Sequence, residues 1–424
     1  MLLYKNFFQF ITRSPTSWHA AKTIGNCLAE ADFSPLSEKE RWTLESGNSY
    51  FVQREGSLVC AFRLPKKKPT SAILLASHTD SPALKIKPNP DVSNQGICQL
   101  LTEVYGGPLL HSWLDRELAL AGRIETDQGS KLIFLDDFAL HIPQLPIHLD
   151  RTISEKGIFV HKQDHLKAIL SIQGTNTLES VLKQRYSFQT LYAHDLFLVP
   201  TEKPAATGLH QELIAGYRLD NLSSAFASLG ALILAEQRSE TLQMAIFWDH
   251  EEIGSVTSTG AASLFVNQML ERITLALGQS LEDLYLLKSN AMALSIDVTH
   301  GWNPNFPDKY DPQNAPHLGK GVCVKFHAGR KVASDAASAA YIFKLAEKLE
   351  QKLQPGANRS DIPGGSTVGP IMSANSGIPT VDLGVPCWAM HSTREIISAS
   401  DLKNLGDLLK IVLGTWTPQE ERLL

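Results

Sequence analysis

Long hydrophobic runs are missing from this chain of 424 residues, as are the usual signals for export. No stretch reaches the roughly 18 to 20 uninterrupted apolar residues of a membrane span, so we expect no membrane insertion. The apolar start, Met1 to Ile11, is interrupted by Lys5 and is followed by Arg13 instead of a small-residue cleavage site. This pattern predicts a short amphipathic helix at the start of a soluble, unexported protein.

Paired cysteines and a net positive charge are also missing. The cysteines are odd in number and widely scattered, and none forms a C-x-x-C pair: Cys27, Cys60, Cys98, Cys323 and Cys387. Such usage argues against a disulfide framework and favours reduced thiols in a cytoplasmic compartment. The net charge of -5 gives no broad basic surface, so we expect no nucleic-acid partner.

The composition that remains is that of an ordinary globular protein, long enough for two domains with a large core. Apolar runs of strand and helix type alternate over residues 1–95 and 212–424, which predicts an α/β domain with a mainly parallel sheet and helices on both faces. Residues 96–211 differ, because short apolar runs are cut there by Gly, Pro and Asp. We interpret them as a smaller, β-rich domain that interrupts the first.

Chemistry is concentrated where the run Met244 to Trp248 leads into Glu251, Glu252 and a glycine. Successive side chains of an extended segment point to opposite faces. One carboxylate could therefore face a metal ion while its neighbour faces the bound water, a division of labour that suits metal-assisted hydrolysis. The competing interpretation is an acidic pair solvated in a loop.

Five candidate metal ligands follow apolar strands or stand at strand-to-helix turns: His78, Asp220, Glu252, Asp297 and His391. Ligands of open α/β sheets bind outside the carboxyl ends of the strands, so this repeated placement is hard to attribute to helix capping alone. Two histidines and three carboxylates suit two zinc-like ions with one bridging carboxylate. Glu251 would then be the general base, and Asp80 could support the metal site.

Competing catalytic motifs are absent from the sequence. Gly254 stands where H-E-x-x-H needs its second histidine, and the turn Gly364 to Val368 misses G-x-S-x-G by one residue. Lys325 lies inside an apolar strand, where an unpaired ammonium is costly. Either its stem snorkels outward or a buried anion meets it.

With these residues laid out, the chain resembles the aspartyl aminopeptidase family over nearly its whole length. The motifs are S-H-T-D-S-P at 77–82, E-V-Y-G-G at 103–107, H-S-W-L-D-R at 111–116, R-L-D-N at 218–221, D-H-E-E-I-G-S at 249–255 and M-H-S-T-R-E at 390–395. The resemblance implies a catalytic α/β domain interrupted by a β-rich dimerisation domain. It also implies homodimers that assemble into dodecamers.

Carried over by motif, His78, Asp220 and Asp297 would hold one divalent ion, most simply Zn²⁺. Asp220, Glu252 and His391 would hold the other, so that Asp220 bridges. Glu251 is the implied base and Asp80 its support. Lys325 would face the acidic side chain of a peptide's first residue, and His148 would reach into the partner's active site. The implied reaction is removal of an N-terminal Asp or Glu by a metal-bound water.

Two alternatives stay open at this point. A di-zinc aminopeptidase or deacylase of neutral specificity would share the same metal chemistry, and Lys325 is the residue that distinguishes it. A non-catalytic, self-assembling binding protein could keep the fold without the reaction. The presence of Glu251 and of all five candidate ligands argues against that second alternative.

Overall fold

The computed structural model describes residues 2–418, with side chains from residue 5 on. The chain divides into two compact units. Unit 1 comprises the residues up to 80, 205–390 and those from 395 on, and unit 2 comprises 81–204 and 391–394. The sequence predicts the boundaries at 95 and 211 instead. The first boundary lies at residue 80 in the structure, and not at 95, because strand β5 begins at Ala83 and pairs only within unit 2.

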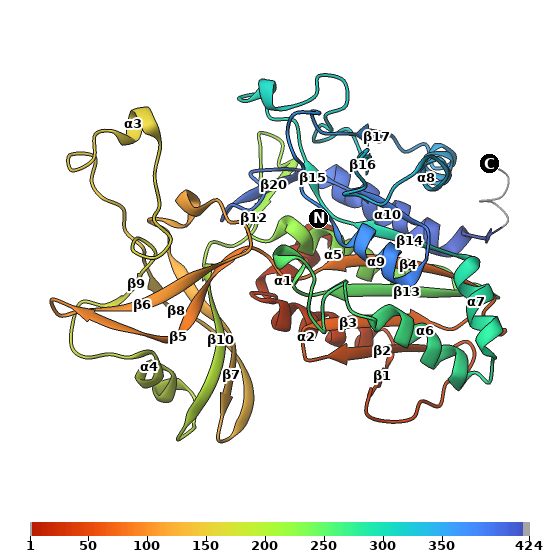
Figure 1. Ribbon diagram of the computed structural model, residues 1–424, viewed down its shortest axis with the longest axis horizontal. Coiled ribbons are helices and arrows are strands. Elements are labelled where there is room, and N and C mark those ends of the chain that lie inside the picture. The colour runs from red at the N-terminus through yellow and green to blue at the C-terminus, as the bar shows by residue number, and fades with distance from the viewer. Residues whose placement is uncertain (1, 419–424) are drawn as a thin grey trace. The chain divides into compact units, whose positions relative to one another are not determined.

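Unit 1 is built on a nine-stranded sheet (Figure 1). The strands run in the order β1 (Ser34–Leu36), β2 (Ser49–Arg54), β3 (Leu58–Arg63), β13 (Thr241–Trp248), β4 (Ser71–His78), β14 (Ala291–Ile296), β18 (Thr380–Gly384), β16 (Val322–Lys325) and β17 (Leu353–Gly356). The four central strands β13, β4, β14 and β18 are mutually parallel, while β3 and β16 join them in antiparallel fashion. The predicted α/β architecture with a mainly parallel sheet is confirmed.

Helices cover both faces of this sheet. One hydrophobic cluster gathers α1 (Leu2–Thr12), α2 (Ser17–Glu30), α5 (Leu219–Leu234), α8 (Ala336–Lys348) and α10 (Ala399–Thr415). The other gathers α6 (Phe265–Ala276), α7 (Leu281–Ser289) and α9 (Val368–Ser376). Strand β4 feeds both clusters alternately, since Ile73 and Leu75 lie in the first and Leu74 and Ala76 in the second. Every residue of β4, β13 and β14 is buried, as expected for central parallel strands.

Unit 1 also contains a second, five-stranded sheet. Its order is β11 (Ala205–Thr207), β12 (Leu213–Gly216), β20 (Glu395–Ser398), β19 (Pro386–Trp388) and β15 (Thr299–His300). Two short 3₁₀ helices, η2 (Glu251–Ile253) and η3 (Pro307–Lys309), complete the unit. Within the described residues no helix is long and apolar enough to cross a membrane.

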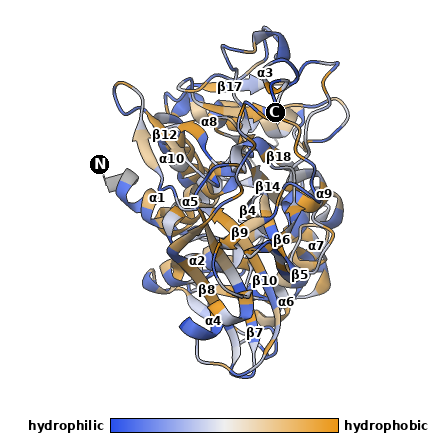
Figure 2. Cartoon of the chain, turned by 90° about the vertical axis from the view of Figure 1, so that its left-hand side faces the viewer, coloured by the Kyte–Doolittle hydropathy of each residue, from blue (hydrophilic) through white to orange (hydrophobic). Residues whose placement is uncertain are grey.

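Unit 2 is a six-stranded antiparallel sheet, which agrees with the β-rich character expected of the central segment. Its order is β8 (Gly129–Leu140), β7 (Leu118–Thr126), β10 (Leu191–Pro200), β5 (Ala83–Asn94), β6 (Ile97–Tyr105) and β9 (Ala168–Ser171). The helices η1 (Leu110–Trp113), α3 (Ile153–Lys156) and α4 (Leu178–Arg185) lie in its connections. The hydropathy of both units can be followed along the chain in Figure 2.

Candidate metal centre

Three of the predicted ligands meet at one edge of the large sheet. His78 is the last residue of β4, and Asp297 directly follows β14, its parallel neighbour. Asp220 comes from the turn that opens α5, where Arg218 has a positive φ of 66° and Asp220 itself is non-helical. Because parallel strands end at the same edge, residues far apart in the sequence arrive at one point.

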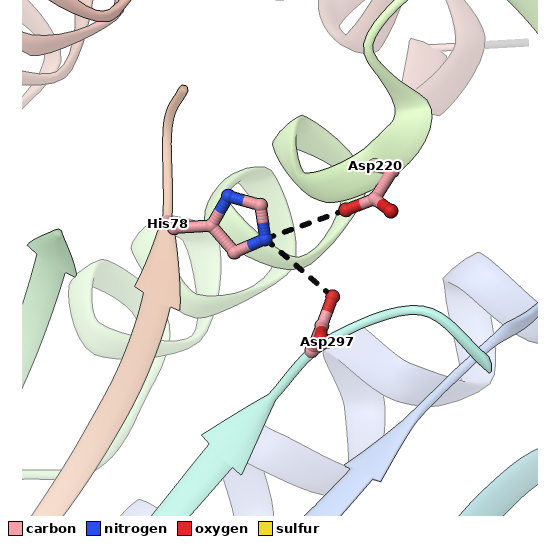
Figure 3. Close-up of side chains that lie close together, drawn as sticks. All are labelled: His78, Asp220 and Asp297. Atoms are coloured by element: carbon pink, nitrogen blue, oxygen red, sulfur yellow. Dashed lines mark ion pairs between the residues drawn. The ribbon is translucent and has the colours of Figure 1, made fainter. Parts of the chain in front are cut away.

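Figure 3 shows these three side chains pointing toward one another. Nε2 of His78 lies 3.4 Å from Oδ1 of Asp220 and 3.6 Å from Oδ1 of Asp297. Hydrogen bonds between such atoms are about 2.7 to 3.2 Å long. Ligands about 2.0 to 2.15 Å from a tetrahedral ion stand about 3.3 to 3.5 Å apart, which is close to the observed spacing. The set His78, Asp220 and Asp297 could therefore hold a metal ion.

A buried carboxylate oxygen supports this fit. Oδ1 of Asp297 is buried and accepts no hydrogen bond from any residue between 2 and 418. An ionised oxygen removed from water without a donor is costly, whereas a divalent ion would compensate it. The donor set of one imidazole nitrogen and two carboxylates is also the kind that zinc and similar ions prefer.

The His78 ring is oriented for a ligand role. Its Nδ1 lies 3.1 Å from the backbone oxygen of Asp80 and 3.4 Å from the Asp80 carboxylate. In the neutral ring, Nδ1 therefore carries the proton and Nε2 is the nitrogen with a lone pair for a metal ion. Burial lowers the pKa of His78, but Asp220, Asp297 and Asp80 outweigh it and hold the pKa well above its usual value. A positive charge is thus stabilised at the place where a metal ion would bind.

Glu251 and Glu252 stand on a tight turn, which corrects one expectation. We expected them at the end of an extended strand, but β13 ends at Trp248 and both residues lie in η2, after His250 at a positive φ of 62°. Asp80 holds this turn, because its two carboxylate oxygens accept the backbone N–H groups of Glu251 and Glu252, each at 3.1 Å.

Glu251 reaches the same site as the three ligands. Its Oε2 lies 3.9 Å from Nε2 of His78. Burial, followed by the charges of Asp297, Glu252 and Asp80, raises the pKa of Glu251 well above its usual value, although His78 opposes the shift. A carboxylate with a raised pKa is a stronger base than a solvated one, which is the property that a general base beside a candidate metal site needs.

Lys325 meets a buried anion and does not snorkel. The residue is only 8% exposed at the end of β16, and its Nζ donates to the backbone oxygen of Val298 at 2.8 Å. The same Nζ lies 3.6 Å from Oδ2 of Asp297. Asp297 therefore faces His78 with one oxygen and Lys325 with the other.

His391 and His148 are carried by unit 2. His391 has a positive φ of 67°, and its Nδ1 lies 3.1 Å from the backbone oxygen of Gly107, in the E-V-Y-G-G motif. Its Nε2 is the ring nitrogen on the far side of that contact. His148 is exposed in the loop after β8 and is not among the side chains grouped as possible metal ligands.

Sequence reasoning missed two residues that contact a candidate ligand or the residue next to one. Asn221 donates to the backbone oxygen of Ile296, next to Asp297, at 2.8 Å. Glu395 accepts the backbone N–H of Asp220 at 2.9 Å. Both stand at the ends of motifs noted in the sequence, R-L-D-N and M-H-S-T-R-E, and this position was the only signal that could have indicated them.

The chain is similar to known proteins along nearly all of its length. A "Probable M18 family aminopeptidase 2" of Pseudomonas syringae pv. syringae is 36% identical over 422 residues, covering 96% of this chain and 97% of that protein. Its counterpart in Clostridium novyi is 36% identical over 409 residues, covering 92% of this chain and 94% of that protein.

Solved structures agree with these sequence matches. The M18 aminopeptidase of Thermotoga maritima superposes with a TM-score of 0.88 at 27% identity, covering 98% of this chain and 96% of that chain. Ape4, solved in complex with Nbr1, superposes with a TM-score of 0.91 at 31% identity, covering 99% and 86%. The family model of the aminopeptidase I zinc metalloproteases (M18) matches residues 10–411 of this sequence. The chain therefore belongs to the M18 family and is a metallo-aminopeptidase.

Proposed function

We propose that this enzyme removes an N-terminal Asp or Glu from peptides, with two divalent ions, Zn²⁺ in the simplest case, and Glu251 as general base. His78, Asp220 and Asp297 would hold the first ion. Asp220, Glu252 and His391 would hold the second, as the family resemblance implies, so that Asp220 bridges. The ions would polarise the scissile carbonyl and acidify the attacking water.

The chain's own residues then divide the remaining work. Glu251 takes a proton from the attacking water and delivers it to the leaving amine, a task that its raised pKa favours. Asp80 fixes the turn that carries both Glu251 and Glu252. His78 keeps its Nε2 directed at Asp220 and Asp297, because its Nδ1 is engaged with Asp80.

The observation that carries the acidic specificity is the buried ammonium of Lys325 beside Asp297. An ion held by His78, Asp220 and Asp297 would draw on the same Asp297 charge, which leaves the ammonium only partly neutralised. The carboxylate of a substrate's first residue would supply the missing negative charge. A substrate with a neutral first residue leaves that charge uncompensated, a loss that can reach roughly 10³-fold in kcat/KM.

The test compares reporters that begin with Asp, Glu, Ala or Leu. The wild type should prefer the acidic ones, and Lys325→Met, which keeps the apolar stem, should lose most of that preference. Lys410→Met, which removes an exposed lysine of α10, is the matched control and should leave the preference unchanged. A wild type that prefers Leu indicates the alternative of neutral specificity. An acidic preference that survives in Lys325→Met shows that another residue is the selector.

The role of Glu251 needs its own measurement, because His78, Glu251 and Glu252 also form a set that could hold an ion. Glu251→Gln removes the proton acceptor but leaves all five proposed metal ligands unchanged. We expect turnover to disappear while the metal content, measured by mass spectrometry, stays near that of the wild type. Loss of an ion together with turnover would make Glu251 a ligand instead.

We also propose that unit 2 mediates assembly of homodimers, and that these build the larger dodecameric assembly that the family resemblance implies. His148 lies between Ile147 and Leu149 in a loop whose apolar side chains face solvent; Leu149 is 73% exposed and Phe159, farther along, 79%. Apolar surface of this kind is typical of a protein contact. In this proposal His148 acts in the partner's site, and the five reduced thiols fit a cytoplasmic setting.

A further inference from the structure

A second buried carboxylate lies directly against the proposed bridging ligand. Glu395, the first residue of β20, is 1% exposed, and its Oε2 accepts the backbone N–H of Asp220 at 2.9 Å. The same buried carboxylate is close enough to Tyr217 and Arg218 to affect their pKa values. A carboxylate this deeply buried is costly unless it is hydrogen-bonded and balanced in charge, so its place needs an explanation.

The pairing of β20 with β12 determines where Glu395 lies. Strand β20 pairs antiparallel with β12, and Glu395 stands opposite Gly216. The chain leaves β12 at Gly216 and reaches Asp220 four residues later, through Arg218 at a positive φ of 66°. The side chain of Glu395 thus lies beside the turn that presents Asp220.

That turn has a donor which the helix cannot use. Asp220 and Asn221 both have non-helical dihedral angles, and the first N–H groups of any helix lack partners within the helix. Glu395 takes the N–H of Asp220. A carboxylate acceptor makes a stronger bond to this N–H than a neutral group would, so the backbone of Asp220 is held firmly while its side chain faces His78.

Arg218 brings a positive charge near Glu395. Its guanidinium is buried and donates through Nη2 to the backbone oxygen of Ile11 at 2.9 Å. Its Nε and Nη1 find no hydrogen-bond partner in the described part of the chain. Burial lowers the pKa of Arg218 to about 10, while Tyr217 and Glu395 raise it. A cation near a carboxylate offsets part of the cost of burying both groups.

We propose that Glu395 is a positioning residue for metal binding, which holds Asp220 in the orientation that both ions require. This inference rests on the proposed role of Asp220 as a shared ligand. It adds a residue that touches neither substrate nor ion. Residues that orient metal ligands typically contribute about 10- to 100-fold to metal affinity.

The test measures divalent-ion affinity on the full-length chain after metal removal. Zn²⁺ binding is followed by competition with a chelator, and the thermal midpoint is recorded without metal. Glu395→Gln keeps an acceptor for the Asp220 N–H but loses the charge, so we expect affinity about 10-fold weaker. Glu395→Leu loses the acceptor as well, and we expect about 100-fold weaker binding. The metal-free midpoint of Glu395→Gln should stay within a few degrees of the wild type.

Asp401→Asn is the matched control. Asp401 is equally buried in unit 1, and its carboxylate accepts the N–H groups of Gly319 and Gly321 at 2.7 and 2.9 Å, away from the proposed ligands. This control should lower the metal-free midpoint and leave Zn²⁺ affinity unchanged. Turnover gives a second readout: added Zn²⁺ should restore activity to Glu395→Gln and should not restore it to Glu251→Gln.

Three outcomes would overturn the proposal. Glu395→Gln that binds Zn²⁺ as tightly as the wild type would exclude a positioning role. Equal losses of affinity in Glu395→Gln and Asp401→Asn would reduce the effect to general stability. A wild type that binds no divalent ion, or whose Asp220→Ala variant binds as tightly, would remove the proposed metal function itself, which separates that failure from the failure of Glu395.

Discussion

Asp80→Asn should separate the support of the catalytic turn from the catalytic groups themselves. Each oxygen of the Asp80 carboxylate accepts one backbone N–H, from Glu251 and from Glu252, and both distances are 3.1 Å. The side chain is buried, with only 4% of its surface exposed, so water cannot replace either bond. Asparagine has the same shape but only one acceptor, and its NH₂ group would face an N–H of the turn.

The magnitude follows from what asparagine cannot reproduce. One hydrogen bond to a charged group is lost, a contribution of about 1.5 to 3 kcal/mol, and the buried N–H left behind adds a penalty of similar size. We expect the turn to shift so that part of the penalty is relieved, and a net loss of about 2 to 4 kcal/mol in the transition state. That corresponds to a fall of about 30- to 900-fold in kcat/KM.

The assay is kcat/KM on an Asp-reporter at saturating Zn²⁺, together with metal content. Asp335→Asn is the control, because Asp335 caps α8 by accepting the N–H of Ser338 and asparagine is an equally good cap. That control should retain wild-type activity. An Asp80→Asn enzyme within about threefold of the wild type would refute the assigned support, since the turn would then hold its shape without the carboxylate.

Three further predictions concern other residues. Asp220→Ala should lower the bound metal, measured by mass spectrometry, at both sites, because a bridging carboxylate belongs to two ions; full occupancy would exclude bridging. Mixed dimers of Glu251→Gln and His148→Ala chains should regain part of the activity that each lacks, and no recovery after subunit exchange would exclude a shared site. Burial above all lowers the pKa of His19 to about 4. Below about pH 6.5, His19 is therefore protonated in the unfolded chain but stays neutral in the folded chain. The free energy of unfolding should fall by about 2 to 3 kcal/mol between pH 6.5 and 4. His19→Gln should remove this part of the pH dependence of the thermal midpoint.

The sequence was informative wherever burial on both faces leaves a pattern. The apolar runs at 72–76 and 292–296 predicted the strands that the structure places at Ser71–His78 and Ala291–Ile296. Parallel strands end at a common edge, so the polar residues that follow them could be placed together before any coordinates existed. His78 and Asp297 meet for this reason, 3.6 Å apart.

Contacts across sequence-distant elements could not be predicted in the same way. Glu395 and Asp220 are 175 residues apart, and they meet because β20 pairs with β12 in one register. A slip of one residue would point the Glu395 side chain to the opposite face. The local turn at Glu251 was also missed, because a 3₁₀ turn of three residues leaves no hydrophobic periodicity. The sequence also allows either solvent or an anion as the partner of Lys325, because no local pattern distinguishes the two.

The charges around the site explain why several of its residues hold other side chains or turns in place. Carboxylates outnumber the cationic groups there, and they act on two pKa values in the same direction. Burial and neighbouring carboxylates raise the pKa of Glu251, and despite burial the carboxylates also raise that of His78. Without metal the site therefore stabilises protons where the divalent ions would bind. Lys325 offsets part of the negative charge of Asp297. The carboxylate of Asp80 is stabilised by the two backbone N–H groups that donate to it. The excess negative charge suits dications, and it stays at the site only because buried partners such as these hold each carboxylate in place.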